Sequence, residues 1–404
     1  MKILALGGCG EMGGYAVKTL LKSVSPPEIM IADRNAVAAE DFARGLGNGV
    51  GWMALDISDR NALDEAVQKA DLVMNTVGPY FRFGKSVLTA CIRGGKDYMD
   101  ICDDWEPTLE MLDLCDEAEK SGITAIIGLG ASPGISNMLA VKAIEELDTV
   151  TEIYTGWDLD SAKPEKTGRK PSAATVHGIH QLTGTIRAFE NGRYVDKKPI
   201  RRITLDYPGI GAGRAWTMGH PEAVTLPRYF QGLLLSNNIM VTTRANFFGL
   251  KMIALLVDAG CISVERAAWI AEKLEGAAEP ERTPAAMLAD IVAARSPGLP
   301  PLFALARGEK GGQSATAACM ITSAPSGGMG GATGVPLAVG AMLLEKGVVL
   351  KKGVFAPEGV IRPDDFFDIL GPLCTPPRNS VNETVLTTRS WEAGQVDQLL
   401  QKLF

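Results

Sequence analysis

Residues 2–13 decide the fold of the first part of the chain; they read Lys2-Ile3-Leu4-Ala5-Leu6-Gly7-Gly8-Cys9-Gly10-Glu11-Met12-Gly13. The apolar run is typical of a short buried strand, and a helical pattern follows the glycines as far as Lys22. The spacing Gly-x-Gly-x-x-Gly permits a tight turn at the first glycine, close approach to a pyrophosphate at the second and close helix packing at the third. The helix N-terminus then directs N–H donors at the anion. We therefore expect a dinucleotide to contact Gly8, Gly10, Glu11, Met12 and Gly13.

Strand and helix patterns alternate after this turn. The predicted strands cover residues 2–6, 28–33, 51–55, 72–76, 97–101 and 123–128. Helical stretches separate them, and Ser58 and Asp59 are suited to cap the third helix. Six strands alternating with helices are typical of a doubly wound parallel sheet. The sequence predicts an α/β chain whose Rossmann domain covers residues 1–132.

The pattern changes beyond Leu147, where strands become longer and more polar, as in Thr151–Trp157. Asn191-Gly192 between apolar residues predicts a two-residue hairpin turn, and a second hairpin is expected over 302–321. These features predict an α+β substrate domain with an antiparallel sheet over 133–335 and 348–404.

Other segments of this second part have their own signals. Helices are expected over 264–274, 285–295 and 336–346. Residues 322–334 are rich in glycine and serine, so we expect a linker or a mobile loop there.

The residues that end the early strands are expected to hold the rest of the dinucleotide. Asp33 lies twenty residues past Gly13, where a carboxylate bonds the ribose 2′-hydroxyl and repels a 2′-phosphate, so NAD is favoured. Arg34 follows and could hold that phosphate, which leaves NADP possible. Asp56 and Ile57, after the third strand, are expected beside the adenine ring. The segment expected at the nicotinamide end comprises Asn75, Thr76, Val77, Gly78 and Pro79.

Composition excludes several classes of protein. The 404 residues are 46% hydrophobic with a formal net charge of −7, so the chain can bury a sizeable core and has no basic excess for nucleic acid. No segment has the roughly 18 consecutive apolar residues of a membrane span. The seven cysteines are odd in number and contain no Cys-x-x-Cys pair. We therefore expect a reducing, cytoplasmic location without a disulfide framework or a zinc site.

Several blocks in order carry a family resemblance: the glycine turn, 75–80, 98–104, Gly130-Ala131-Ser132-Pro133-Gly134-Ile135-Ser136-Asn137, 333–336 and 353–358. With these blocks the chain resembles the saccharopine dehydrogenase and lysine 6-dehydrogenase superfamily. The resemblance implies NAD(P)-dependent hydride transfer at the C–N bond of a small amino acid or opine substrate, through an imine. It also implies a late helix, near 336–347, that returns to the dinucleotide domain, and a homodimer.

Such a reaction needs a group that accepts a proton from the amine, and histidine is the natural candidate. The chain has three histidines, His177, His180 and His220. His177 and His180 are three residues apart and share a face of a predicted helix, so one of them could be the acceptor. The pair with His220 could instead bind a metal, or the two could be structural. We expect no metal at this site.

Other polar residues could act on the substrate. After the fifth strand, Asp100 or Asp103 could bind an ammonium group, or the acidic cluster could cap the next helix. Tyr80 is a further catalytic candidate, whereas neighbouring carboxylates would raise the pKa of Cys102 and argue against a nucleophile. Arg244, like Arg82 and Arg228, could clamp a carboxylate with two hydrogen bonds.

A second class of function remains open at this stage. The few histidines and the weak resemblance of residues 161–285 also suit a non-catalytic NAD-binding protein that regulates a partner.

Overall fold

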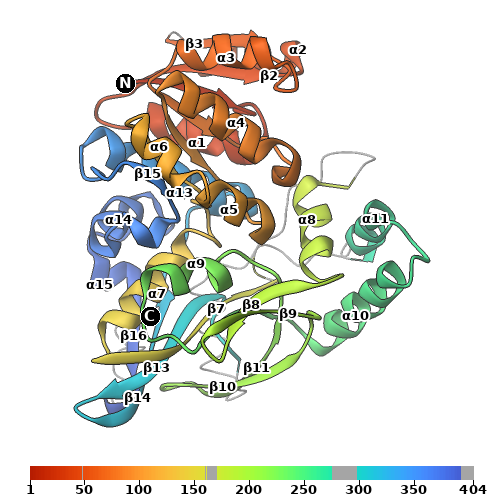
Figure 1. Cartoon of the computed structure of the whole chain (residues 1–404), viewed down its shortest axis with the longest axis vertical. Helices are drawn as coiled ribbons and strands as arrows, with labels where there is room; N and C mark the ends of the chain where they lie inside the picture. The colour runs from red at the N-terminus through yellow and green to blue at the C-terminus, as the bar shows by residue number, and fades with distance from the viewer. Residues whose placement is uncertain (48, 160, 162–170, 275–297, 393–404) are drawn as a thin grey trace. The chain divides into compact units, whose positions relative to one another are not determined.

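The computed structural model describes residues 1–47, 49–159, 161, 171–274 and 298–392. The chain divides into two compact units, Met1–Ile135 with Met329–Phe366, and Ser136–Gly328 with Phe367–Phe404. Each unit contains one β-sheet (Figure 1). The helix predicted over 285–295 lies outside the described residues.

The first unit contains a seven-stranded sheet in which every neighbouring pair is parallel. The strand order is β15-β6-β5-β4-β1-β2-β3, so the order reverses at β1, and ligands of such sheets bind at that switch point. The strands are β1 (Lys2–Leu6), β2 (Glu28–Asp33), β3 (Val50–Ala54), β4 (Leu72–Asn75), β5 (Asp97–Asp100), β6 (Thr124–Ile126) and β15 (Gly353–Phe355). The predicted doubly wound parallel sheet is confirmed, with one strand more than the six expected.

Helices alternate with these strands as expected. They are α1 (Glu11–Leu21), α2 (Ala36–Leu46), α3 (Arg60–Gln68), α4 (Tyr80–Gly94), α5 (Trp105–Leu112), α6 (Cys115–Lys120) and α13 (Gly328–Glu345). Asp59 caps α3 by accepting hydrogen bonds from the N–H groups of Asn61 and Ala62. The helical stretch between β5 and β6 is divided into two helices, α5 and α6.

Two segments near the end of the chain differ from the expectation. The glycine-rich residues from Gly328 to Gly334 are not a loop but the first turns of α13. A Cβ on Gly334 would lie 2.2 Å from the main-chain oxygen of Met12 in α1, so glycine is needed for the close contact of the two helices. Residues 353–355, expected in the substrate domain, form β15 and pair with β6 of the first sheet.

The second unit contains a nine-stranded mixed sheet, mostly antiparallel. Its main order is β10-β11-β12-β7-β13-β14-β16, with β8 paired to β12 and β9. The pair β12–β7 is parallel, which the expected antiparallel sheet did not include. The strands are β7 (Thr149–Asp158), β8 (Ile186–Glu190), β9 (Arg193–Lys197), β10 (Arg202–Tyr207), β11 (Gly211–Thr217), β12 (Leu235–Val241), β13 (Leu302–Lys310), β14 (Gln313–Ile321) and β16 (Val385–Arg389).

Both hairpins predicted in this unit are present. Asn191 and Gly192 have φ of +53° and +71°, as a two-residue turn between β8 and β9 requires. Gly311 and Gly312 turn the chain between β13 and β14 with φ of +59° and +75°. The helices of this unit are α7 (Ile135–Glu145), α8 (Ala173–Gln181), α9 (Glu222–Tyr229), α10 (Arg244–Asp258), α11 (Val264–Leu274) and α15 (Val381–Thr384), with 3-10 turns at Gly371–Leu373 and Ser390–Glu392. The 3-10 turn at Pro357–Gly359 belongs to the first unit, and the chain passes from the first unit to the second within α14 (Pro363–Leu370).

The two faces of the second sheet differ in polarity. One face packs an aromatic and aliphatic core that includes Tyr154, Tyr207, Ile239 and Phe303, with the rings of Tyr207 and Phe303 in edge contact at 5.7 Å. The other face carries buried polar side chains of β7 and β12 beside the apolar side chains of Trp216 and others. Alternate residues of a strand point to opposite faces, so the polar side chains of β7 and β12 that are two residues apart lie on the same face of the sheet.

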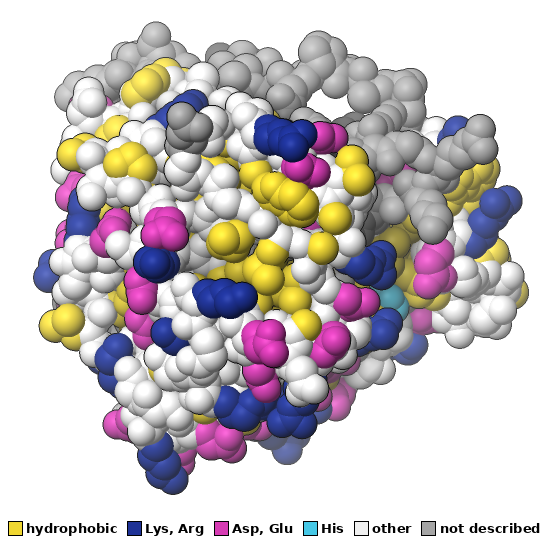
Figure 2. Space-filling model, turned by 90° about the horizontal axis from the view of Figure 1, so that it is seen from above, with side chains coloured by type: hydrophobic (Ala, Val, Ile, Leu, Met, Phe, Trp, Pro, Cys, Tyr) yellow, Lys and Arg dark blue, Asp and Glu magenta, His cyan; other side chains and the backbone are white. Residues whose placement is uncertain are grey.

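No helix among the described residues combines the length and the apolar composition that crossing a bilayer needs. On the face seen in Figure 2, basic and acidic side chains alternate, with apolar side chains among them. That face therefore presents no continuous basic surface, and the absence of a nucleic-acid partner stays a prediction.

Candidate dinucleotide site and a buried polar cluster

Main-chain groups build the glycine turn between β1 and α1. The N–H of Gly7 donates to the carbonyl of Ala32 on β2 at 2.9 Å, and the N–H of Gly10 donates to the carbonyl of Gly7 at 2.9 Å. Gly7 has φ of +70°, so the left-handed residue of the tight turn is Gly7 rather than the predicted Gly8. At Gly8 a Cβ would lie 2.9 Å from the Cβ of Ala5, so glycine is needed at this position because the chain packs closely there.

The same turn fits an anionic pyrophosphate. A Cβ on Gly13 would lie 2.4 Å from the carbonyl oxygen of Gly7, so this glycine brings α1 against the end of β1 as predicted. Gly10 is exposed and forms the N-cap of α1, whose first residues are Glu11 and Met12. The first N–H groups of a helix have no acceptor within the helix, so they point outward beside an open glycine. That arrangement can hold a diphosphate by main-chain hydrogen bonds.

Asp33 ends β2 next to this turn, and both of its carboxylate oxygens have partners. The N–H of Asn35 donates to Oδ1 at 2.8 Å, and the thiol of Cys9 donates to Oδ2 at 3.2 Å. Burial, followed by the hydrogen bond to Asp33 and the charge of Asp33, raises the pKa of Cys9 to about 12, so Cys9 stays a protonated donor. The carboxylate retains lone pairs for a ribose hydroxyl.

The other residues predicted for the dinucleotide follow β3. Asp56 is exposed, and its pKa is lowered chiefly by the N–H of Ser58, which donates to Oδ1 at 2.9 Å, with smaller contributions from the charges of Arg34 and Arg82. Arg34 is exposed, and Ile57 is half-buried. A phosphate beside Asp33 would therefore meet both a carboxylate and the nearby guanidinium of Arg34.

The segment after β4 is fixed by its own side chains. Thr76 donates from Oγ1 to the carbonyl of Leu6 on β1 at 2.9 Å, and the N–H of Val77 donates to Oδ1 of Asn75 at 3.0 Å. Gly78 is exposed, and Pro79 is the N-cap residue of α4. All of these residues lie at the carboxyl edge of the sheet, as predicted.

A buried hydrogen-bond chain runs along this edge from β4 to β6. Asn75 donates from Nδ2 to the hydroxyl of Tyr98 at 3.1 Å, and that hydroxyl donates to Oδ2 of Asp100 at 2.8 Å. The other oxygen, Oδ1 of Asp100, accepts from the N–H groups of Cys102 at 3.0 Å and Gly128 at 2.7 Å. The carboxylate of Asp100 therefore connects the ends of β5 and β6 directly and the end of β4 through Tyr98.

Asp100 and Tyr80, both predicted as catalytic, are buried beside this chain. Burial raises the pKa of Asp100 to about 6, although its three hydrogen bonds oppose the shift. The hydroxyl of Tyr80 is buried and donates to the carbonyl of Asn75 at 2.9 Å, and burial holds its pKa well above the usual range. The catalytic role of these two residues stays a prediction.

The acidic residues after β5 do not form the expected cap. Asp104 occupies the N-cap position of α5 without a capping hydrogen bond from its side chain. Asp103 is half-buried, and its charge raises the pKa of both Asp100 and Tyr80. Asp103 therefore remains a predicted substrate ligand. Burial, followed by nearby carboxylates, holds the pKa of Cys102 well above the usual range, in agreement with the argument against a nucleophile.

The two predicted histidines lie on α8 in the second unit. Ser172 caps this helix, and Ile179 binds it into an apolar core. His177 is buried and His180 is exposed, so the two side chains of the predicted pair have different surroundings. Their role as proton acceptors stays a prediction.

His220 belongs to a buried cluster that the predicted site did not include. Its Nδ1 lies 2.7 Å from Oε2 of Glu222, and the hydroxyl of Ser136 donates to Oε1 at 2.6 Å. His220 and Glu222 are 1% and 0% exposed. The ring of Trp157 lies 6.4 Å from that of His220. A carboxylate on Nδ1 fixes the tautomer of a histidine and leaves Nε2 as the position that accepts a proton.

The local sequence explains this placement. Pro221, between the histidine and the glutamate, has φ of −60° and starts α9 with Glu222 as its first residue. The main-chain carbonyl of Glu222 accepts from the hydroxyl of Ser236 on β12 at 3.3 Å, which ties α9 to the sheet. The pattern His-Pro-Glu at the start of a helix could have been recognised from the sequence. The contact with Ser136 could not, because Ser136 lies 86 residues earlier than Glu222.

The arginines proposed as carboxylate clamps occupy different elements. Arg82 and Arg228 are exposed, and the guanidinium of Arg82 lies 4.8 Å from the ring centre of Phe83. Arg244 begins α10, and its side chain lies outside the described atoms. Its role stays a prediction.

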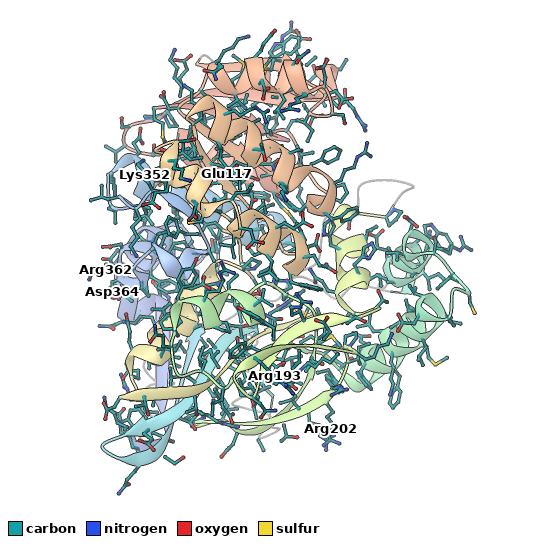
Figure 3. All side chains as sticks on the ribbon, in the orientation of Figure 1. Glu117, Arg193, Arg202, Lys352, Arg362 and Asp364 are labelled. Carbon is teal, nitrogen blue, oxygen red and sulfur yellow. The ribbon has the colours of Figure 1, made fainter. Side chains whose placement is uncertain are left out.

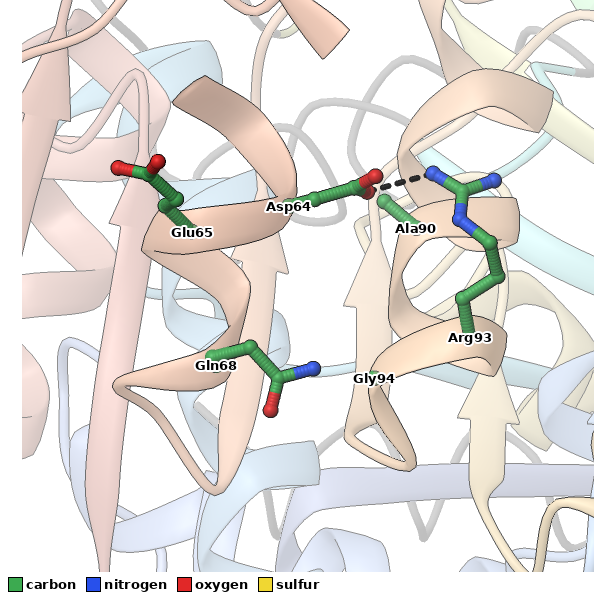
Figure 4. Close-up of a pocket in the computed structure, with 6 residues that line it drawn as sticks. All are labelled: Asp64, Glu65, Gln68, Ala90, Arg93 and Gly94. Carbon is green, nitrogen blue, oxygen red and sulfur yellow. Dashed lines mark hydrogen bonds and ion pairs between the residues drawn. The ribbon is translucent and has the colours of Figure 1, made fainter. Parts of the chain in front are cut away.

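A surface hollow of about 350 Å³ lies elsewhere in the first unit (Figure 4). It is lined by Asp64, Glu65, Gln68, Ala90, Arg93 and Gly94, and an ion pair of Asp64 with Arg93 crosses it. These residues come from the C-terminal parts of α3 and α4, which lead into the starts of β4 and β5. The hollow is thus at the edge opposite the glycine turn and is unrelated to the dinucleotide site.

Two family models match the chain: the saccharopine dehydrogenase NADP binding domain over residues 3–126 and the saccharopine dehydrogenase C-terminal domain over residues 130–374. The second match alone covers more than half of the chain. The chain belongs to the saccharopine dehydrogenase family. This is a family of NAD(P)-binding oxidoreductases, so the predicted family, fold class and general type of activity are confirmed.

Individual relatives show how far the likeness extends. Saccharopine dehydrogenase [NADP(+), L-glutamate-forming] of Schizosaccharomyces pombe is 34% identical over 175 residues, 42% of this chain and 38% of that protein. Carboxynorspermidine synthase of Vibrio alginolyticus is 26% identical over 199 residues, 43% of this chain and 44% of that protein. The chain thus matches about two fifths of the length of these relatives.

A solved structure shares the fold over nearly the whole chain. Apo histidine-tagged saccharopine dehydrogenase (L-Glu forming) from Saccharomyces cerevisiae has a TM-score of 0.61 at 16% identity, covering 96% of this chain and 99% of that one. The likeness covers both sheets, and at this identity it concerns the fold alone.

Proposed function

We propose that the protein is an NAD-dependent oxidoreductase that acts on the C–N bond of an amino acid or an opine-type secondary amine. The observation that carries the proposal is the glycine turn beside Asp33, at the switch point of a parallel sheet, in a chain that matches both domains of this family. The reaction would be an oxidation to an imine, as in lysine 6-dehydrogenase, or its reductive reverse, as in saccharopine and carboxynorspermidine formation.

The nicotinamide supplies the hydride acceptor in such a reaction, and the protein supplies binding and proton transfer. The substrate amine must lose a proton before its carbon can release a hydride. We assign this proton to His220, because Glu222 on Nδ1 orients the ring and stabilises its charged form. Ser136 in turn holds Glu222. His177 and His180 are the alternative acceptors.

We propose NAD rather than NADP. The carboxylate of Asp33 favours a ribose 2′-hydroxyl and repels a 2′-phosphate, and Cys9 and Asn35 hold it in place. Three observations favour NADP: the nearby Arg34, the description of the matching N-terminal family model and the cofactor in the name of the S. pombe relative. Asp33→Ala should weaken NADH binding about tenfold and leave NADPH binding unchanged or improved. Equal loss for both nucleotides would contradict the assignment.

A screen of the purified protein tests the reaction. NAD and NADP are each combined with amino acids, diamines and amine–carbonyl pairs, and nicotinamide absorbance at 340 nm, the standard readout of such cofactors, is followed. His220→Asn and Glu222→Gln test the proposed acceptor, and His177→Asn and His180→Asn test the alternative acceptors on α8. Turnover that His220→Asn abolishes supports the proposal, and turnover that only His177→Asn or His180→Asn abolishes moves the acceptor to α8.

The second candidate is an NAD-binding protein that regulates a partner without catalysis. Tight NADH binding without turnover in any combination would favour it. The homodimer and the cytoplasmic location are further predictions, to be measured by light scattering and by fractionation of the cells that express the protein.

A further inference from the structure

One face of the second sheet carries a group of buried polar side chains. On this face β7 presents Thr155 and Trp157, and β12 presents Ser236 and Asn238, because alternate residues share a face. Thr155, Ser236 and Asn238 are 1% exposed each. The hydrogen bond from Nδ2 of Asn238 to Oγ1 of Thr155, at 2.9 Å, confirms that the two strands present these side chains to the same side.

Two atoms of this face stand out, Nε1 of Trp157 and Oδ1 of Asn238. Both are buried, and within the described part of the chain neither has a hydrogen-bond partner. A buried polar atom without a partner is costly, so native proteins rarely retain one without a reason. The amide nitrogen of Asn238 donates to Thr155, so the amide oxygen is the atom of this side chain that lacks a partner among the described residues. Nε1 of Trp157 can only donate a hydrogen bond, and Oδ1 of Asn238 can only accept one.

The two atoms are neighbours on the sheet. Asn238 is in register with Thr155, and Trp157 is two residues further along β7 on the same face. Such diagonal neighbours on one face are close enough for an aromatic side chain to extend toward the neighbouring strand. The ring of Trp157 is also 6.4 Å from that of His220.

The described core beside Trp157 is apolar. Leu182, Trp216, Met218 and Met240 form this core, against which Trp157 itself packs. The buried Lys197 donates from Nζ to Oδ1 of Asn237, on the opposite face of β12. Arg193 and Arg202, labelled in Figure 3, are exposed. An apolar wall with a few convergent polar atoms is typical of a ligand pocket.

We propose that Trp157 and Asn238 form a subsite for an uncharged group of a small ligand that accepts one hydrogen bond and donates another, a carboxamide or a hydroxyl. Nε1–H of Trp157 donates to the ligand oxygen, and Oδ1 of Asn238 accepts the ligand N–H or O–H. A carboxylate is rejected because it has no hydrogen to donate to Oδ1 of Asn238. The inference rests on the proposed function only in taking this ligand to be the substrate.

The experiment uses the full-length chain labelled with ¹⁵N at tryptophan, which gives one indole N–H signal for each of the six tryptophans. Trp157→Phe identifies the signal of Trp157. The probes are four amino acids that differ at the end of the side chain: L-glutamine, 5-hydroxy-L-norvaline, L-glutamate and L-norvaline. We expect the Trp157 signal to move downfield with glutamine or hydroxynorvaline, and to stay in place with glutamate and norvaline.

Variants test whether the two atoms act together. Asn238→Ala and Trp157→Phe should each weaken the responding probe about tenfold, as loss of one buried hydrogen bond predicts. Asn237→Ala, one residue away on the opposite face, and Trp269→Phe on α11 are the matched controls and should change affinity less than twofold. Binding by the Asn238→Ala variant is followed by the Trp157 signal, and binding by Trp157→Phe by calorimetry.

The outcomes separate this inference from the proposed function. A Trp157 signal that no probe moves, or that glutamate moves as much as glutamine, overturns the subsite, whether or not the protein turns over an amine. A response to glutamine or hydroxynorvaline but not to glutamate or norvaline, without any nicotinamide turnover, supports the subsite and contradicts the proposed reaction. If turnover is found, unchanged KM values in Asn238→Ala and Trp157→Phe would also contradict the subsite as a substrate site.

Discussion

The buried carboxylate of Asp100 makes stability depend on pH in a direction opposite to that of most carboxylates. Its pKa is raised from 3.8 to about 6 by burial, so the folded chain binds this proton more tightly than the unfolded chain. Stability from this group is complete below the unfolded pKa and is lost as the pH rises through 6. Replacing Asp100 with asparagine keeps the shape of the side chain and removes the titration.

The magnitude follows from the shift. Each pH unit below 6 stabilises the native protein by ~1.4 kcal/mol until the unfolded group also titrates, ~3 kcal/mol in all. Between pH 7.5 and 5.0 the native protein should gain ~1.4 kcal/mol that Asp100→Asn does not. At pH 7.5 the variant loses the hydrogen bond from Tyr98, because an amide nitrogen cannot accept it, at a cost of ~1–3 kcal/mol. Removal of the buried charge offsets part of that cost.

The two units need not unfold together, so the assay must report on the first unit by itself. Hydrogen exchange with mass spectrometry, in a urea series at pH 7.5 and 5.0, gives the opening free energy for peptides that contain the amides of Cys102 and Gly128. Both amides donate to Asp100. A native-to-variant difference that is the same at both pH values within ~0.3 kcal/mol, the usual additivity error, would refute the raised pKa. A native protein that loses stability on acidification relative to the variant would show that the three hydrogen bonds dominate over burial.

Three further predictions follow from single contacts. Gly334→Ala places a Cβ 2.2 Å from a main-chain oxygen of α1 and should lower stability by ~1–3 kcal/mol or more in thermal unfolding, whereas Gly45→Ala, with no atom within 4 Å of its Cβ, should raise it by ~0.5–1 kcal/mol. In Glu222→Gln the amide cannot stabilise a charged histidine, so kcat with the amine found by the screen should fall about 10²–10⁴-fold and its pH profile should shift, an outcome that an unaltered profile would contradict. Cys9→Ala should reduce the preference for NADH over NADPH by a few-fold while Cys9→Ser, which keeps a donor to Asp33, retains it; equal ratios in the two variants, measured by fluorescence titration, would count against this role.

Local sequence patterns predicted the first sheet and the hairpins of the second sheet, because their signals are local. The turn from β1 to α1 needs glycine within six residues, and Asn191-Gly192 needs two left-handed residues in a row. The error at 328–334 has the same origin. Glycine indicates a turn when only neighbours in sequence are considered, whereas here it removes a Cβ between α13 and α1, which lie more than 300 residues apart. Strand β15 has three residues, too few to show any period.

The site in the second unit was hidden for a different reason. Ser136 and Glu222 meet across 86 residues, and no pattern in either segment indicates the other. The polar face of β7 and β12 did weaken the strand signal, since Thr155 and Asn238 stand where an apolar residue would be expected of a buried strand. A buried strand that gives up apolar side chains on one face loses stability there, and the loss has to be offset by bonds between the polar groups. On this face, as far as the structure describes the chain, the hydrogen bonds are incomplete at Trp157 and Asn238. The stability of the fold therefore does not explain these two side chains, whereas the binding of a ligand does.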